Sequence, residues 1–161
     1  MKTKKVAARL LLSALLSVAM IYPSLALAAD NTAQSDRIVV ISSKSFDQTN
    51  DAIKSLVAKN GMMVMAEVDQ GNMLSMTGFS LKAKLYLIGN PTVGKQLFEQ
   101  NHSVGLYVPL RLFIYNDENG KTQISYDKPS ALLAQYQNAK ITMVAQMLDK
   151  KLEDLANMAA H

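Results

Sequence analysis

Residues 110–126 read LRLFIYNDENGKTQISY and decide the fold, because they predict a β-hairpin. Two alternating apolar runs flank an acidic, glycine-containing turn, which is a typical hairpin pattern. A three-residue loop at 118–120, with Gly120 in a left-handed conformation, would place Ile114 and Ile124 on one face. A two-residue turn would shift the register by one step and move Ile124 to the other face. We prefer the three-residue loop, since it collects the aliphatic side chains on one face.

Outward from this hairpin, the pattern predicts further strands and helices. Ser45 and Gln48 match a capping box at a helix start, and Pro91 and Pro129 each suit a first helical turn. Residues 70–72 are predicted as a turn, and residues 73–81 stay ambiguous between helix and loop. The predicted strands cover 37–42, 62–68, 83–88, 110–116 and 121–126, and the last helix covers about 139–159.

These elements predict an α+β fold, in which a small, mostly antiparallel sheet carries helices packed on one face. The predicted domain covers residues 37–136, and residues 137–161 are expected to contain a C-terminal amphipathic helix. That helix could dock on the domain's own sheet, pair with a second copy or bind a partner protein. Its polar side is mixed in charge, which argues against binding to an anionic membrane surface.

Residues 1–28 have the organisation of a secretory signal peptide. Four basic residues precede an apolar stretch at 10–21, and the segment ends in the small-x-small pattern of residues 26–28. The apolar stretch is shorter than the roughly 20 residues of a membrane-spanning helix, although an uncleaved membrane anchor is the alternative. We expect an exported protein, periplasmic or secreted, that is cleaved near Ala28 and has no stable membrane insertion afterwards. Residues 29–36 are expected to form a flexible lead.

Charge and composition exclude several functions for the mature chain. Of the 17 Lys and Arg residues, four lie in residues 1–28, so thirteen remain and balance the 13 Asp and Glu residues. A chain without excess positive charge is not expected to bind nucleic acid. The chain has no Cys, which excludes thiol catalysis and thiolate metal sites.

From Thr49 to Tyr136, the order of landmarks resembles the domain-of-unknown-function 302 family, also called TT1751-like. The resemblance implies a small α+β domain, often a homodimer, and it implies no activity. Members often carry a His after the second strand, where this chain has Asp69. The matching landmarks are the helix from Thr49 to Gly61, LIGNP at 87–91, VPLR at 108–111, DENGK at 117–121, ISY at 124–126 and Pro129.

Two features suggest a binding site for a small anionic ligand or a partner protein. The helix start at Asn90-Pro91 could aim backbone N–H groups at an anion, although a simple helix cap is the alternative. Arg111 lies in an apolar strand, where its planar guanidinium could bind a carboxylate or phosphate. We expect a pocket near Asn90, Arg111 and Tyr126. The predicted ligand-binding residues are Asn90, Thr92, Val93, Lys95, Arg111 and Tyr126.

A methionine cluster suggests copper as the alternative. Thioether sulfur suits Cu(I), and the spacing of two methionines three residues apart occurs twice. Packing in the core is the competing explanation, because neighbouring strand residues point to opposite faces. The predicted metal ligands are Met62, Met65, Met73, Met76 and His102.

No sequence motif supports catalysis, and we predict no catalytic residues. Glu67 and Asp69 share a strand face, and His102 is the one internal imidazole, so these three residues are the available acid–base set. We expect binding rather than enzyme activity, with no required cofactor.

Overall fold

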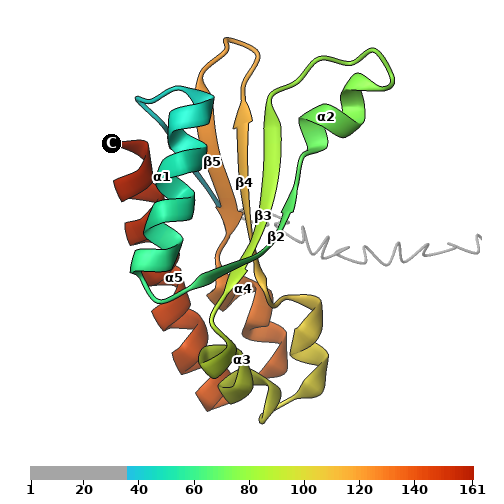
Figure 1. The fold of residues 1–161 in the computed structure, drawn as a ribbon. Helices are drawn as coiled ribbons and strands as arrows, with labels where there is room; N and C mark the ends of the chain where they lie inside the picture. Colours follow the sequence, from blue (N-terminus) through green and yellow to red (C-terminus); the bar gives the residue numbers. More distant parts are fainter. Residues whose placement is uncertain (1–35) are drawn as a thin grey trace, which may run out of the picture. The chain divides into compact units, whose positions relative to one another are not determined.

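The structure is a computed structural model that describes residues 36–161. The predicted signal peptide and all but Asp36 of the predicted lead lie outside the described residues. Five strands form one antiparallel sheet in the order β1-β5-β4-β3-β2 (Figure 1). The strands are β1 (Arg37–Ile41), β2 (Met63–Val68), β3 (Ala83–Gly89), β4 (Leu110–Asn116) and β5 (Thr122–Asp127). The predicted α+β class is confirmed.

The central hairpin of β4 and β5 has the predicted register. Ile114 lies opposite Ile124, and Gly120 adopts a φ of 76° in the three-residue loop. The Asp117 carboxylate accepts hydrogen bonds from the backbone N–H groups of Asn119 and Lys121, both at 2.9 Å. The backbone hydrogen bond from Lys121 is the largest cause of the lowered pKa of Asp117. Local turn chemistry therefore fixes which strand residues face the core.

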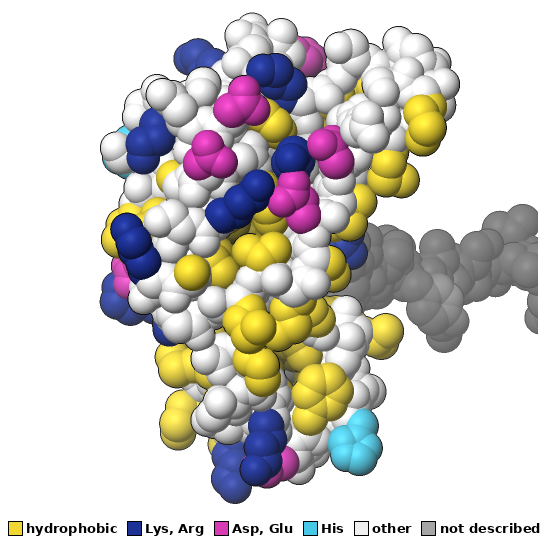
Figure 2. Space-filling view, viewed as in Figure 1, with side chains coloured by type: hydrophobic (Ala, Val, Ile, Leu, Met, Phe, Trp, Pro, Cys, Tyr) yellow, Lys and Arg dark blue, Asp and Glu magenta, His cyan; other side chains and the backbone are white. Residues whose placement is uncertain are grey.

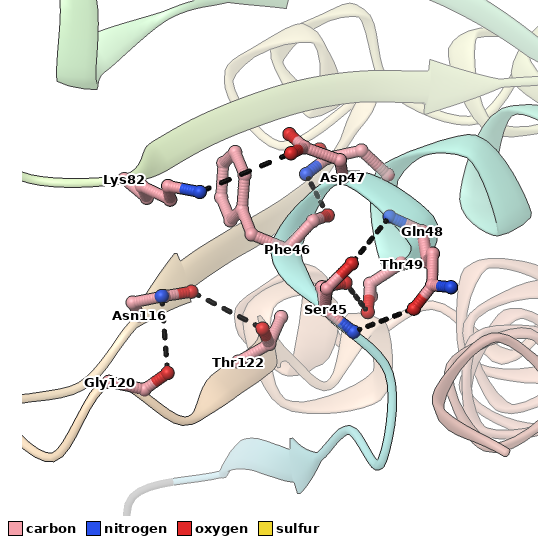
Figure 3. A network of polar contacts seen from close by, with 10 residues as sticks. Ser45, Phe46, Asp47, Gln48, Thr49, Lys82, Asn116, Gly120 and Thr122 are labelled. Carbon is pink, nitrogen blue, oxygen red and sulfur yellow. Dashed lines mark hydrogen bonds and ion pairs between the residues drawn. The ribbon is translucent and has the colours of Figure 1, made fainter.

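Two helices, α1 (Phe46–Lys59) and α5 (Ala139–Ala160), lie on the same side of the sheet (Figure 1). The predicted capping box is present at α1, where the Gln48 N–H donates to Ser45 Oγ and the Ser45 N–H donates to Gln48 Oε1 (Figure 3). Leu152 and Leu155 of α5 are fully buried. We call the side of the sheet that these helices cover the helix-covered face, and the opposite side the open face.

The segment after β2 differs from the prediction. Residues 70–72 open helix α2 (Gln70–Ser75) instead of forming a turn, because the Asp69 carboxylate accepts a hydrogen bond from the Asn72 N–H at 2.8 Å. Gly71 is buried against the Leu81 carbonyl oxygen, so closely that a Cβ atom would overlap it. The absence of a side chain at Gly71 therefore lets α2 pack on the chain entering β3.

The remaining helical segments lie at the ends of the sheet. Helix α3 begins with the predicted Asn90 cap and Pro91, and Pro129 starts α4 as predicted. Figure 1 shows α2 and α3 at opposite ends of the sheet. None of the helices in residues 36–161 is long and apolar enough to cross a membrane. The bounds are α3 (Pro91–Phe98), α4 (Pro129–Leu133) and the 3-10 helices η1 (His102–Leu106) and η2 (Ala134–Tyr136).

Edge strand β2 contains a β-bulge. Val64 pairs with Ile88 and Ala66 pairs with Leu87, so Met65 is an extra residue in β2. A bulge bends its strand and interrupts the regular ladder of hydrogen bonds. Met65 is consequently half-exposed at the edge of the sheet.

Candidate functional site

The larger of two hollows in the described part of the chain lies on the open face of the sheet and has a volume of about 630 Å³. That volume lies within the range of roughly 300–1,000 Å³ that is usual for small-molecule sites. Strands β1, β3, β4 and β5 supply its floor, and residues of α2, η1 and α4 border it. The lining residues that bear on its chemistry are Arg37, Leu85, Arg111, Phe113, Tyr115 and Asp127.

Arg111, from strand β4, is an exposed cation that lines this hollow. Its strand neighbours Phe113 and Tyr115 stack with ring centres 4.9 Å apart and planes 15° apart. Among residues 36–161, Arg111 takes part in no side-chain hydrogen bond or ion pair. A guanidinium beside a flat aromatic surface can grip a carboxylate or phosphate with two parallel hydrogen bonds.

The other guanidinium in the hollow is already paired. Arg37 Nε donates to Asp127 Oδ1 at 2.9 Å, and Arg37 Nη2 donates to Asp127 Oδ2 at 3.2 Å. This two-point contact raises the pKa of Arg37 further. Asp127 therefore neutralises Arg37 and leaves Arg111 as the cation that faces the hollow.

Hydrogen bonds hold the aromatic pair in place. The Tyr115 hydroxyl donates to Gln123 Oε1 at 2.6 Å, and Gln123 Nε2 donates to Asp117 Oδ2 at 2.8 Å. The chain of contacts links the stacked rings to the tight turn of the hairpin. A side chain fixed in this way costs little conformational entropy when a ligand packs against it.

Tyr126 lines the same hollow as Arg111, although it pairs in register with Ile38 on the helix-covered face. Burial is the main cause that raises its pKa to about 12, so the hydroxyl stays protonated at neutral pH. Tyr86 is fully buried, and its hydroxyl donates to Asn50 Oδ1 at 2.7 Å.

The start of α3 does not offer the predicted free donors. The N–H groups of Thr92 and Val93 both donate to Asn90 Oδ1, at 2.8 and 3.1 Å. Asn90 Nδ2 donates in turn to the Gly61 carbonyl at 2.6 Å. The predicted anion site at this helix start is thus a helix cap, which was the alternative explanation of the sequence.

The predicted pocket is divided between two cavities. Asn90, Val93 and Lys95 line a second, smaller cavity of about 170 Å³. Arg111 and Tyr126 line the large hollow of the open face instead. The ligand-binding role of these residues stays a prediction, and the structure does not bring all of them to one place.

The predicted metal ligands are also spread over the molecule. Met62 is buried in the core just before β2, whereas Met73 and Met76 are exposed beyond the other end of that strand. A six-residue strand spans roughly 20 Å, so these two groups cannot share one ion. Met65 lies in the bulge between them, and His102 begins η1 beyond the opposite end of β3.

The carboxylates of the predicted acid–base set have structural partners. Glu67 contacts Lys54 at 3.3 Å and Lys84 at 2.5 Å, and the hydrogen bond from Lys84 is the largest cause of its lowered pKa. Asp69 caps α2 and lies 3.6 Å from Lys84. His102 follows α3, at the end of the sheet opposite α2. The three residues therefore do not form one site.

Sequence reasoning missed the residues that close the hollow at its sides. Arg37 and Asp127 come together only because β1 pairs with β5, a contact between positions 90 residues apart. Tyr107, which directly follows η1, packs edge-on against Tyr136, with ring centres 6.3 Å apart. The opposite charges of Arg37 and Asp127 were the available sequence signal for this contact. That signal could be used only once the pairing of β1 with β5 was known.

An antiparallel sheet with one helix-covered face and one hollowed face defines a small α+β domain. The chain belongs to the family described as domain of unknown function DUF302, whose model matches residues 38–159. The predicted family is thereby confirmed. A solved structure, an uncharacterized conserved DUF302 protein from Bacillus stearothermophilus, has a TM-score of 0.72 at 22% identity. It matches 76% of this chain and 97% of that chain, and so supports the fold.

The curated relatives are longer proteins. A protein named fluoride-specific ion channel FluC 1, from Brucella suis, is 30% identical over 112 residues. The match covers 69% of this chain and 42% of that protein. FluC 2 from Brucella melitensis is likewise 30% identical over 112 residues, and the match covers 40% of it. The chain thus spans less than half the length of these relatives.

Proposed function

We propose that this protein is an exported, non-enzymatic binding domain whose open face takes a ligand or partner through a carboxylate or phosphate group. The observation that carries this proposal is the exposed Arg111 beside the stacked rings of Phe113 and Tyr115. The anionic group would meet the guanidinium fork, and an apolar or aromatic part would lie on the two rings.

The chemistry of the hollow favours recognition over catalysis. Asp127, the one carboxylate among its described lining residues, is engaged by Arg37. The Tyr115 hydroxyl is engaged by Gln123, so it is not placed as a free acid or base. A general base must be a free proton acceptor within hydrogen-bond reach of the substrate. The Asp127 carboxylate and the Tyr115 hydroxyl instead form hydrogen bonds within the protein.

A membrane protein as partner is the second candidate. The relatives named as fluoride channels match this chain over only part of their length, so a similar domain accompanies additional sequence there. For this chain, we infer that a partner protein could present an acidic side chain to Arg111. A second copy of the chain is a further possible occupant of the open face.

Export is tested by mass spectrometry. The full chain is expressed in a Gram-negative host, and the intact mass is measured in the periplasmic fraction. Cleavage after Ala28 is the expected result. Recovery of the uncleaved chain in the membrane fraction would instead support the anchor alternative. Native spectra of the same sample, with and without Cu(I), report the number of subunits and test the copper alternative.

Anion binding is tested by NMR titration of the mature protein with benzoate and, separately, with inorganic phosphate. We expect saturable shifts at residues of the open face, and loss of these shifts in Arg111→Gln. Arg111→Lys keeps the charge but removes the fork, so partial loss is expected. Lys140→Gln, on the exposed start of α5, is the matched control for loss of one charge. Identical titrations of Arg111→Gln and the parent protein would refute the proposed site.

A further inference from the structure

The second cavity, of about 170 Å³, lies where β3 and β4 meet α3 and α5. Its inner wall consists of buried aliphatic side chains from four different elements. None of these residues is more than 7% exposed, so the wall is part of the hydrophobic core. The inner-wall residues are Ile88, Leu97, Leu110 and Leu148.

The outer wall is apolar and half-exposed. Met65 is 47% exposed and Phe98 is 40% exposed, so the cavity lies directly under accessible side chains. Figure 2 shows hydrophobic side chains gathered on the surface in the region between β2 and α3. The Phe98 ring rests on Gly105, where an added Cβ atom would lie 3.3 Å from the ring. The ring is therefore held against η1 rather than collapsed into the cavity.

The polar groups at the cavity have partners already. Asn90 uses its oxygen for two backbone N–H groups and its nitrogen for the Gly61 carbonyl. Lys95 Nζ lies 3.5 Å from Glu99 Oε1, so the rim carries a compensated charge. A charged ligand would gain no unpaired partner among these residues, whereas an uncharged apolar ligand would leave every hydrogen bond intact.

We propose that this cavity binds a free, uncharged hydrocarbon-like molecule of about the size of one aromatic ring. An enclosed apolar cavity of about 150 Å³ can bind benzene, so the volume of this cavity, which is partly open to solvent, is sufficient for one ring. The flexible thioether of Met65 can adapt to the bound shape and contact an aromatic edge. This inference goes beyond the proposed function, because it uses neither Arg111 nor the open face.

The test is a titration of the ¹⁵N-labelled mature protein with toluene, followed by NMR. We expect saturable shifts concentrated in α3 and at Gly89 and Leu148, with the open face unchanged. Absence of saturable shifts, or shifts confined to the open face, would overturn the proposal. The unsubstituted protein decides this result, so the test does not depend on any variant folding.

A filled cavity provides the second arm of the test. A Cβ atom at Gly89 would lie 3.6 Å from both Met65 Cε and Pro109 Cβ, which is ordinary contact with two cavity-lining residues, so Gly89→Leu adds a side chain among the residues that line this cavity. We expect toluene affinity to fall by about tenfold or more as the space is occupied. Gln96→Leu places the same side chain on an exposed part of α3 outside the cavity and is expected to bind normally.

The open-face proposal and the cavity proposal can be refuted independently of each other. Arg111→Gln is expected to lose benzoate binding and to keep toluene binding. Unchanged toluene affinity in Gly89→Leu would overturn the cavity proposal and leave the open-face proposal standing.

Discussion

The two faces of the sheet are built from alternate residues of the same strands, yet one face is buried under helices and the other lines the large hollow. In β4, Leu112 and Ile114 are fully buried beneath the helices, whereas their neighbours Arg111 and Phe113 reach the hollow of the open face. Burial of aliphatic side chains supplies most of the stability of such a domain. For the proposed binding role of Arg111, this comparison predicts that stability and recognition can be altered separately by changing residues one position apart.

The largest expected effect is on the helix-covered face. Leu112→Ala removes a fully buried side chain and leaves a cavity, so we expect a loss of about 3 kcal/mol in the free energy of unfolding. Ile41→Ala, on the open side of edge strand β1 and 56% exposed, is the matched comparison and is expected to cost less than about 1 kcal/mol. Urea unfolding measures both, and equal losses would contradict the distinction between the faces.

A smaller effect is expected for the buried hydrogen bond between sheet and helix. Tyr86→Phe leaves Asn50 Oδ1 without its donor, and we expect a loss of about 1–2 kcal/mol. Tyr115→Phe removes a hydroxyl from the open face, where water can replace the contact with Gln123, so its cost is expected to be below about 0.5 kcal/mol. Thermal unfolding of the two variants in parallel measures both losses. A loss in Tyr86→Phe no larger than that in Tyr115→Phe would contradict the importance of the buried hydrogen bond.

The stability of the helix-covered face is expected to depend on pH in the alkaline range, through Tyr126. Burial raises the pKa of Tyr126 to about 12, whereas an unfolded tyrosine titrates near its usual value of about 10. The unfolded chain therefore releases this proton first, so the stability that Tyr126 contributes is complete below pH 10 and is lost as pH rises from about 10 to 12. Tyr126→Phe is expected to flatten this part of a pH–stability curve. An unchanged slope would show that other groups cause the alkaline loss.

The smallest expected effect is on the ion pair of the open face. Asp127→Asn breaks an exposed ion pair with Arg37, and we expect the free energy of unfolding to fall by less than about 1 kcal/mol. At high salt the ion pair is screened, so the difference between the variant and the parent protein should disappear. Arg37→Gln should cost about the same, and the double variant should cost no more than either single change. Additive losses in this double-mutant cycle would mean that the two side chains act through separate contacts.

The predictable part of the fold is the part that local chemistry determines. The hairpin register follows from Gly120 and the alternation around it, and the α1 boundary follows from Ser45 and Gln48. Helix α2 escaped prediction although Asp69 offered a local cap, because Gly71 suggested a turn and the close contact of Gly71 with the Leu81 carbonyl depends on tertiary packing.

The site was less predictable because it depends on long-range pairing. Arg111 was identified from its unusual position in an apolar strand, and it does line the main hollow. The backbone N–H groups of Thr92 and Val93 were expected to be free for an anion, but both donate to the side chain of Asn90, the residue that caps the helix. The methionines share a stretch of sequence, but β2 separates them in space.

The bulge at Met65 has a consequence for the behaviour of the protein at high concentration. An exposed edge strand invites other chains to add to the sheet, which is a common route to aggregation. In β2, the extra residue divides the edge into Met63–Val64 and Ala66–Val68, and neither piece is long enough to template a stable additional strand. We therefore expect the interruption to weaken the addition of another chain at the exposed apolar residues Met63 and Val64.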